Sequence, residues 1–214
     1  MSLKPREKEP AVPASAGPAA QGSALGGRPC GALARVLARA FREGKPEILV
    51  LGPLSGDSVV YLASRGARVH VEDFDLPPPI PARRPGEPPA DVAPFRLDQP
   101  AGLFHLVLAW EIVDFVPPDR LAEYGGELRR VVKDGGGLFF FSHSRPDPAD
   151  DRLSRYLLLA DDLIVRQVVE RARHPRYVHP TRDIELSLKG FAIQGIQLQR
   201  TQMREITAQK AGMG

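Results

Sequence analysis

The sequence of 214 residues is poor in cysteine and lacks long apolar runs. Its single cysteine, Cys30, has no partner for an intramolecular disulfide, and one thiol provides no cysteine zinc cage. We therefore expect a reducing, cytoplasmic setting. No run of about 18 apolar residues occurs, and the N-terminus MSLKPREKEP carries charges and prolines where a signal peptide has an apolar core. We expect neither export nor a membrane span.

Motifs of several enzyme classes are absent as well. The five histidines show neither HxxxH nor HExxH spacing, so we expect no metal site. There is no GxSxG, as in serine hydrolases, and no GxxxxGK[ST] phosphate loop. The charge is nearly balanced, with 29 basic and 26 acidic residues, and does not indicate a nucleic-acid partner.

Proline is abundant, and most of it lies in two windows. Of the 22 prolines, five fall in residues 1–30 and nine in residues 77–100. Residues 1–28 also show no hydrophobic period, so we expect a disordered Ala/Pro/Gly-rich tail followed by one domain over residues 29–210. Proline breaks helices and central strands, so residues 76–94 are expected to form a long loop.

The first half of the domain follows an alternating α/β pattern. Apolar residues at three- and four-residue spacing predict a helix over Gly31–Glu43. The apolar run Glu47–Leu51 indicates a strand buried on both faces, and the turn GPLSG separates it from a helix over Asp57–Arg65. With a second strand at Arg68–Glu72, these segments predict a right-handed parallel crossover unit.

The second half continues this order and ends in a hairpin. Leu153, Leu157, Ile164 and Val168 favour a helix from about residue 151 to 173, with Asp161-Asp162 as a break. The other predicted elements are a short edge strand at Phe95–Asp98, buried strands at Phe104–Ala109 and Leu138–Ser142, a helix opened by Pro117-Pro118, a short helix from Thr181, and two closing antiparallel strands at Phe191–Gln199 and Met203–Ala208.

The turn LGPLSG resembles the glycine-rich turn of class I S-adenosylmethionine-dependent methyltransferases. Gly52 and Gly56 match two of its three glycines, whereas Leu54 stands where the middle glycine is usual and Val50 where an acidic residue is usual. The resemblance implies that Gly52, Pro53, Leu54 and Gly56 lie against S-adenosylmethionine.

Other segments resemble this family in the same order, over roughly residues 31–210. GARVHVED is similar to the second strand, whose terminal acid binds the ribose hydroxyls; Glu72 matches it, with Asp73 as the rival. FRLDQ is similar to the third strand end, so Asp98 either contacts the adenine or caps a loop. Trp110 and Glu111 lie where the family has residues beside the transferable methyl; the alternatives are core packing for Trp110 and N-capping of a following turn for Glu111.

The resemblance implies a Rossmann-like α/β fold with an open, mostly parallel seven-stranded sheet, an antiparallel C-terminal hairpin and helices on both faces. It also implies methyl transfer from S-adenosylmethionine to a small-molecule or protein acceptor that the sequence does not identify. Positioning supplies much of the rate in such a transfer, so no catalytic residue is assigned. Leu54 and Val50 keep an alternative open: a non-catalytic interaction or regulatory protein that has lost the cofactor. The oligomeric state is not indicated.

Overall fold

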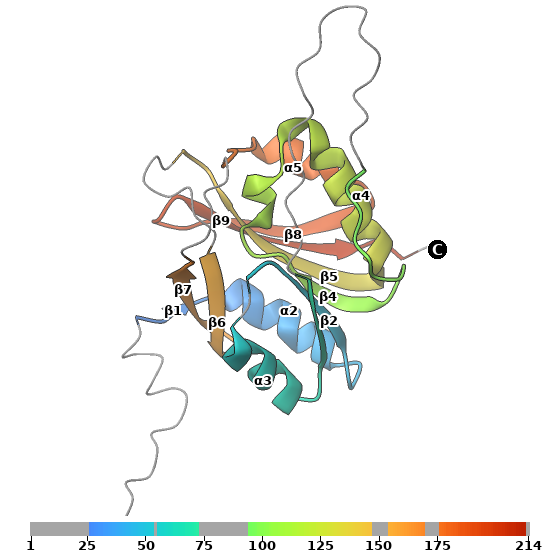
Figure 1. Cartoon of the computed structure of the whole chain (residues 1–214), viewed down its shortest axis with the longest axis vertical. Helices are drawn as coiled ribbons and strands as arrows, with labels where there is room; N and C mark the ends of the chain where they lie inside the picture. Colours follow the sequence, from blue (N-terminus) through green and yellow to red (C-terminus); the bar gives the residue numbers. More distant parts are fainter. Residues whose placement is uncertain (1–25, 54, 73–93, 147–153, 170–175, 213–214) are drawn as a thin grey trace, which may run out of the picture.

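The main sheet has six strands in the order β3-β2-β4-β5-β9-β8 (Figure 1). In this computed structural model, residues 26–53, 55–72, 94–146, 154–169 and 176–212 are described. Strands β2 to β5 run parallel, and β9 lies antiparallel between β5 and β8. The strand bounds are Glu47–Leu51 (β2), Arg68–Glu72 (β3), Phe104–Leu108 (β4), Val132–His143 (β5), Phe191–Leu198 (β8) and Met203–Lys210 (β9). The predicted α/β class and the closing antiparallel hairpin are confirmed.

Helices cover both faces of the sheet because its central strands are apolar on both sides. Ile48 and Val50 point into one buried cluster, and Leu49 and Leu51 point into the other, as the two-residue alternation of a strand requires. The first cluster also contains residues of α2 and α3, and the second contains residues of α4 and α5. The helices are Gly31–Phe41 (α2), Gly56–Ser64 (α3), Leu121–Val131 (α4) and Thr181–Ser187 (α5), with short 3₁₀ turns at Ile112–Phe115 (η1) and Pro118–Arg120 (η2).

The helix predicted from about residue 151 to 173 is wrong. Strands β6 (Ser154–Ala160) and β7 (Leu163–Val168) form an antiparallel hairpin there, and β1 (Arg28–Pro29) adds a third strand. Asp161 and Asp162, expected as a helix break, form the turn of this hairpin. The β-branched residues of β7 favour a strand, and pairing with β6 satisfies its backbone groups.

The prediction of a seventh strand at Phe95–Asp98 is also wrong, since the sheet has six strands in the described part of the chain. Side chains of α4 form hydrogen bonds with the backbone amides and carbonyls of this segment that would otherwise pair with a neighbouring strand. The amides of Phe95 and Leu97 donate to the carboxylates of Glu123 and Glu127, both at 3.0 Å. Arg130 donates to the Leu97 carbonyl at 2.7 Å. The segment is therefore fixed to a helix rather than to β3.

The predicted tail and proline-rich loop fall largely outside the described residues, which begin at residue 26 and omit 73–93. Within the described part, Arg28 pairs with Ile164 of β7. No helix of that part is long and apolar enough to cross a membrane.

Candidate functional site

The turn that follows β2 is tied to the end of β3. The Gly52 amide donates to the Glu72 carbonyl at 2.9 Å, and Gly52 has a φ of +96°. Pro53 is buried, and the Ser55 hydroxyl caps α3 by accepting from the Asp57 amide. Of the residues predicted to contact the cofactor here, Gly52, Pro53 and Gly56 lie in this turn, and position 54 lies outside the described residues.

We expect Gly52→Ala to lower the free energy of unfolding by about 1–2 kcal/mol, because a Cβ at positive φ meets its own backbone. The new Cβ would also lie 2.8 Å from Ile112 Cδ1. Gly56→Ala is the matched control: Gly56 is the first residue of α3, and its Cβ would meet nothing within 4 Å. Urea unfolding of both variants measures the difference; equal stabilities would contradict the turn conformation.

Glu72 ends β3 with one carboxylate oxygen unused. Oε1 accepts the Asp98 amide at 3.4 Å, whereas Oε2 is buried without a hydrogen-bond partner among the described residues. Burial raises the pKa of Glu72. The Asp98 amide, the Gln99 side chain and the charge of Arg130 oppose that shift. The structure therefore brings Glu72 and Asp98 together, with the Asp98 side chain exposed. Asp73 lies outside the described residues.

Trp110, just past the end of β4, is packed in an aromatic stack. It is 1% exposed, and its ring lies 4.8 Å from Tyr156 and 6.2 Å from Phe141, nearly parallel to both. Its backbone has a φ of +38°, which is unusual for a bulky residue. The indole N–H is buried without an acceptor in the described part of the chain. The side chain thus contributes to the core beneath the β6–β7 hairpin.

Glu111 is the centre of a buried ion-pair network. It is 1% exposed; Oε1 accepts from Arg166 Nε at 2.6 Å and from the Tyr156 hydroxyl, and Oε2 accepts from Arg176 Nη2 at 3.0 Å. Burial favours the neutral acid, but the hydrogen bonds and charges of the two arginines outweigh it and lower the pKa of Glu111. The carboxylate does not cap η1 with its side chain.

A second carboxylate extends this network toward the end of β5. Asp114 is fully buried, and its Oδ2 accepts from the His143 amide at 2.9 Å and from Arg176 at 3.1 Å. The same oxygen lies 2.6 Å from His143 Nδ1. The guanidinium of Arg176 also lies over the Phe115 ring. Polar groups from distant parts of the chain therefore meet at the carboxyl ends of β4 and β5, where open parallel sheets bind ligands.

Sequence reasoning missed Tyr156, Arg166 and Arg176. Arg166 lies on β7, which was predicted as helix, and Arg176 lies in a stretch for which no element was predicted. No signal in the sequence indicated these partners; the burial of Glu111 in the structure is what requires a cationic partner. Nothing in the local sequence says which arginine provides it.

Comparisons with known proteins agree on the fold. No protein-family model matches the sequence, and no curated protein matches it. A solved S-adenosylmethionine-dependent methyltransferase from Mesorhizobium loti is 17% identical, with 84% of this chain and 96% of that chain covered and a TM-score of 0.49. The Burkholderia thailandensis 1,6-didemethyltoxoflavin-N1-methyltransferase, solved with S-adenosylhomocysteine, is 15% identical over 84% and 79%, with a TM-score of 0.46.

A structure solved for the conversion of a disulfide bond into a thioacetal group during echinomycin biosynthesis has the higher TM-score of 0.53. It is 14% identical and covers 87% of this chain and 84% of its own. At such identities the similarity concerns the fold and not the activity. Together with the strand order described above, this similarity shows that the chain has a Rossmann-like α/β fold, as its sequence resemblance to the class I S-adenosylmethionine-dependent methyltransferases implies.

Proposed function

We propose that this chain binds S-adenosylmethionine at the carboxyl ends of β2 and β3 and transfers its methyl group to an acceptor. The observation that carries the proposal is Glu72 Oε2, a buried carboxylate oxygen without a partner among the described residues. Leaving such an atom unpaired costs about 1–3 kcal/mol, and a ligand donor removes that cost. The ribose of the cofactor has two neighbouring hydroxyls, which are donors of this kind.

Neighbouring residues suit the other parts of the cofactor. Asp98 is fixed beside Glu72 by its own amide, which leaves its exposed side chain free to accept from the adenine amino group. The turn from Gly52 to Gly56, with Pro53 and Leu54, would lie against the methionine part. Glycine at position 52 lets backbone approach a ligand without a side chain between them.

When bound, S-adenosylmethionine supplies a sulfonium methyl for in-line transfer to a nucleophile. The chain's contribution is to hold the donor and acceptor in line and to exclude water. A dedicated base is optional in such a reaction, and we assign none. The acceptor, whether a small molecule or a protein, would approach past the ends of β4 and β5.

A second candidate is a non-catalytic, methyltransferase-like interaction or regulatory protein. It is favoured by the filled space at the end of β4, where Trp110 stacks on Tyr156 and Glu111 binds Arg166 and Arg176. Trp110 and Glu111 are the residues that the family resemblance puts beside the transferable methyl. A closed ion-pair network there would leave the fold intact and the transfer impaired.

The test is calorimetric titration of the full chain with S-adenosylmethionine and S-adenosylhomocysteine. We expect saturable binding of both, weakened about 10- to 100-fold by Glu72→Ala because a charge-assisted hydrogen bond is lost. Glu185→Ala is the control, since Glu185 is exposed on α5. Binding should also weaken as the pH falls through the raised pKa of Glu72, since protonation removes the acceptor.

Absence of heat with either ligand would overturn the enzyme proposal. Binding that appears only after Leu54→Gly would favour the non-catalytic protein. If Glu72→Ala binds S-adenosylmethionine as tightly as the wild type, Glu72 is not the ribose-binding residue, but the proposal that the chain binds this cofactor stands.

A further inference from the structure

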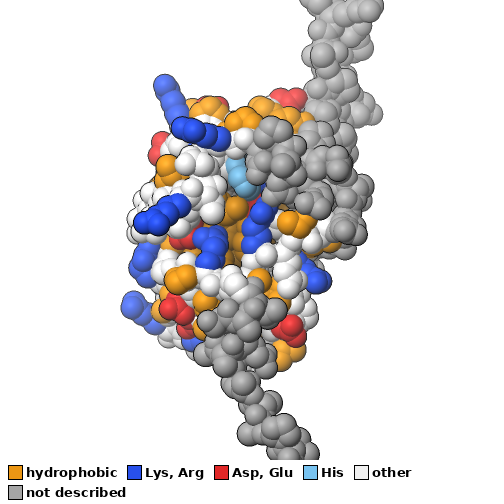
Figure 2. Space-filling model, turned by 90° about the vertical axis from the view of Figure 1, so that its left-hand side faces the viewer, with side chains coloured by type: hydrophobic (Ala, Val, Ile, Leu, Met, Phe, Trp, Pro, Cys, Tyr) orange, Lys and Arg blue, Asp and Glu red, His pale blue; other side chains and the backbone are white. Residues whose placement is uncertain are grey.

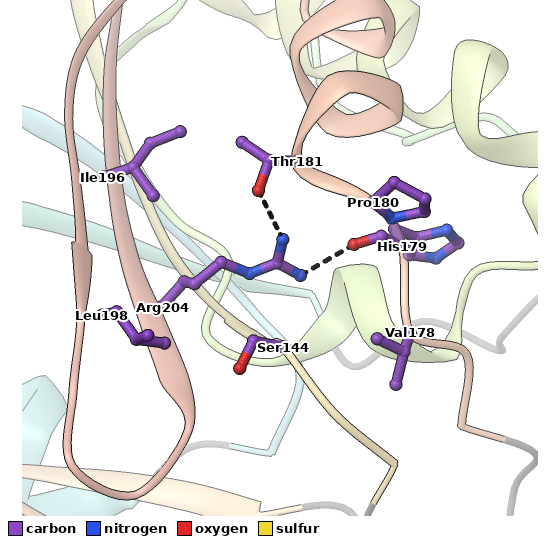
Figure 3. Close-up of a pocket in the computed structure, with 8 residues that line it drawn as sticks. All are labelled: Ser144, Val178, His179, Pro180, Thr181, Ile196, Leu198 and Arg204. Atoms are coloured by element: carbon purple, nitrogen blue, oxygen red, sulfur yellow. Dashed lines mark hydrogen bonds between the residues drawn. The ribbon is translucent and has the colours of Figure 1, made fainter.

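An open pocket of about 530 Å³ lies around Arg204 (Figure 3). The ends of β5 and β8, the beginning of β9 and the segment leading into α5 form its walls. The residues lining it are Ser144, Val178, His179, Pro180, Thr181, Ile196, Leu198 and Arg204. Of the proposed cofactor residues that the structure describes, Gly52, Pro53, Gly56, Glu72 and Asp98 do not line it.

Arg204 is a buried cation with neutral partners only. The residue is 6% exposed, and Nη2 donates to the Ser142 hydroxyl and to the carbonyls of His143 and His179 at 2.7–2.8 Å. Nη1 donates to the Thr181 hydroxyl at 2.9 Å. Nε is buried without an acceptor among the described residues. No carboxylate of the described part of the chain forms an ion pair with Arg204.

The neighbouring arginines differ from Arg204 in this respect. Arg28 pairs with the buried Glu205, while Arg166 and Arg176 pair with Glu111. Asp114, the acid that acts on Arg204 through space, is already bound by Arg176. Burial lowers the pKa of Arg204, and Asp114 opposes this only in part. Burying a cation without a counter-ion costs free energy, and an anion bound beside Arg204 would lower that cost.

The pocket also presents a second donor and an apolar wall. Thr181 accepts from Arg204 and keeps its own hydroxyl proton to donate. The Ser144 proton is taken by the Gln202 carbonyl. In Figure 3, Ile196 and Leu198 lie on one side of the guanidinium and Val178 and Pro180 on the other. One cation beside one hydroxyl, between aliphatic side chains, matches the two oxygens and the apolar body of a carboxylic acid.

We propose that this pocket binds a small monocarboxylate with an apolar body, its carboxylate held by Arg204 and Thr181. A single guanidinium balances one negative charge, which favours a carboxylate over a phosphate dianion. Figure 2 shows several Lys and Arg side chains around hydrophobic ones on one face of the molecule. The site goes beyond the proposed function, because it requires no S-adenosylmethionine.

The experiment is calorimetric titration of the full chain with 3-phenylpropanoate at low salt and without S-adenosylmethionine. We expect saturable binding with a Kd on the order of a millimolar or tighter, and none with the neutral 3-phenylpropanamide. Inorganic phosphate is titrated separately. If phosphate binds more tightly than 3-phenylpropanoate, the proposed ligand class is overturned.

Two variants probe the site without removing the buried cation, since loss of Arg204 would take the donor from its four hydrogen-bond acceptors. Leu198→Glu puts a negative charge on an exposed wall residue and should weaken binding on the order of tenfold. Thr181→Val removes the hydroxyl donor and should weaken it several-fold. Leu186→Glu is the matched control, because Leu186 is similarly exposed, 54% against 61%, and lies outside the pocket.

Selective binding of the carboxylate, lost in Leu198→Glu and kept in Leu186→Glu, supports the site. Equal binding of acid and amide, or binding that neither pocket variant changes, overturns it. So does the absence of saturable heat in the millimolar range. Because no cofactor is present, these outcomes are independent of those for S-adenosylmethionine.

Discussion

Glu111→Ala is expected to lower the free energy of unfolding by about 3–5 kcal/mol at pH 7. The substitution removes the buried acid that Arg166 and Arg176 share, so both arginines lose an ion pair, although Arg176 still pairs with Asp114. It also takes from the buried Tyr156 hydroxyl its strong acceptor; among the described residues, the Met203 sulfur at 3.8 Å is its other hydrogen-bond partner. Breaking a buried network from one side is among the largest effects of a point substitution.

Urea unfolding measures this loss, with Glu185→Ala as the exposed control, for which a change within about 0.5 kcal/mol is expected. Glu111→Gln keeps the shape of the side chain and some of its hydrogen bonds but not the charge. Its free energy of unfolding should therefore lie between those of Glu111→Ala and Glu185→Ala. If Glu111→Ala is as stable as the control, the carboxylate is not the centre of a buried network.

The same residue predicts a dependence on pH. The pKa of Glu111 is lower in the folded protein than its ordinary value of 4.5, so its stabilisation is full above about pH 4.5 and is lost as the pH falls through the folded pKa. The wild-type protein should therefore lose stability in acid more steeply than Glu111→Gln. Parallel stability curves for the two proteins would contradict the shifted pKa.

The parallel core could be predicted from the sequence because each strand carries its own signal. Glu47–Leu51 is a continuous apolar run, and the structure buries Ile48 to Leu51 completely between two layers. A strand that faces helices on both sides has no reason to alternate with polar residues. The turn at Gly52 was predictable for a similar reason, since the glycine there has a positive φ.

The β6–β7 hairpin could not be predicted from spacing alone. Leu157 and Ile164 fit a helical period as well as they fit two short strands, and Asp161-Asp162 is compatible with a break or a turn. Contacts distant in sequence decide between them: the Ser58 hydroxyl on α3 donates to the Tyr156 carbonyl and accepts from the Leu158 amide. A side chain about 100 residues away thus fixes β6 in place.

The candidate site also has a part that the local sequence predicts and a part that depends on contacts distant in sequence. The position of Glu72 at the end of β3 was predictable because the strand has a clear place in the crossover unit, whereas its role toward a cofactor stays a prediction. The network around Glu111 was not, because Arg166 and Arg176 lie 55 and 65 residues further along the chain. Ion pairs of this kind depend on how the hairpin packs against the sheet. These ion pairs fill the space at the end of β4 with side chains that no local sequence motif predicts.

Gly125→Ala is expected to cost about 3 kcal/mol or more, because it forces α4 away from α5. A Cβ at this buried position would lie 1.9 Å from the Ser187 carbonyl oxygen and 2.6 Å from its carbonyl carbon. Those atoms belong to the backbone, so no side-chain rotation relieves the clash, and one helix must shift as a unit. The gain in helix propensity from alanine is far smaller than this cost.

Gly126→Ala is the matched control one residue further along α4. Its Cβ would meet nothing within 4 Å, and the position is exposed. Alanine there should stabilise the protein by about 0.5–1 kcal/mol, because glycine is the poorer helix former. The two variants carry the same chemical change, so the difference between their unfolding free energies isolates the helix contact. Similar stabilities for both would show that α4 and α5 are not in backbone contact at Gly125.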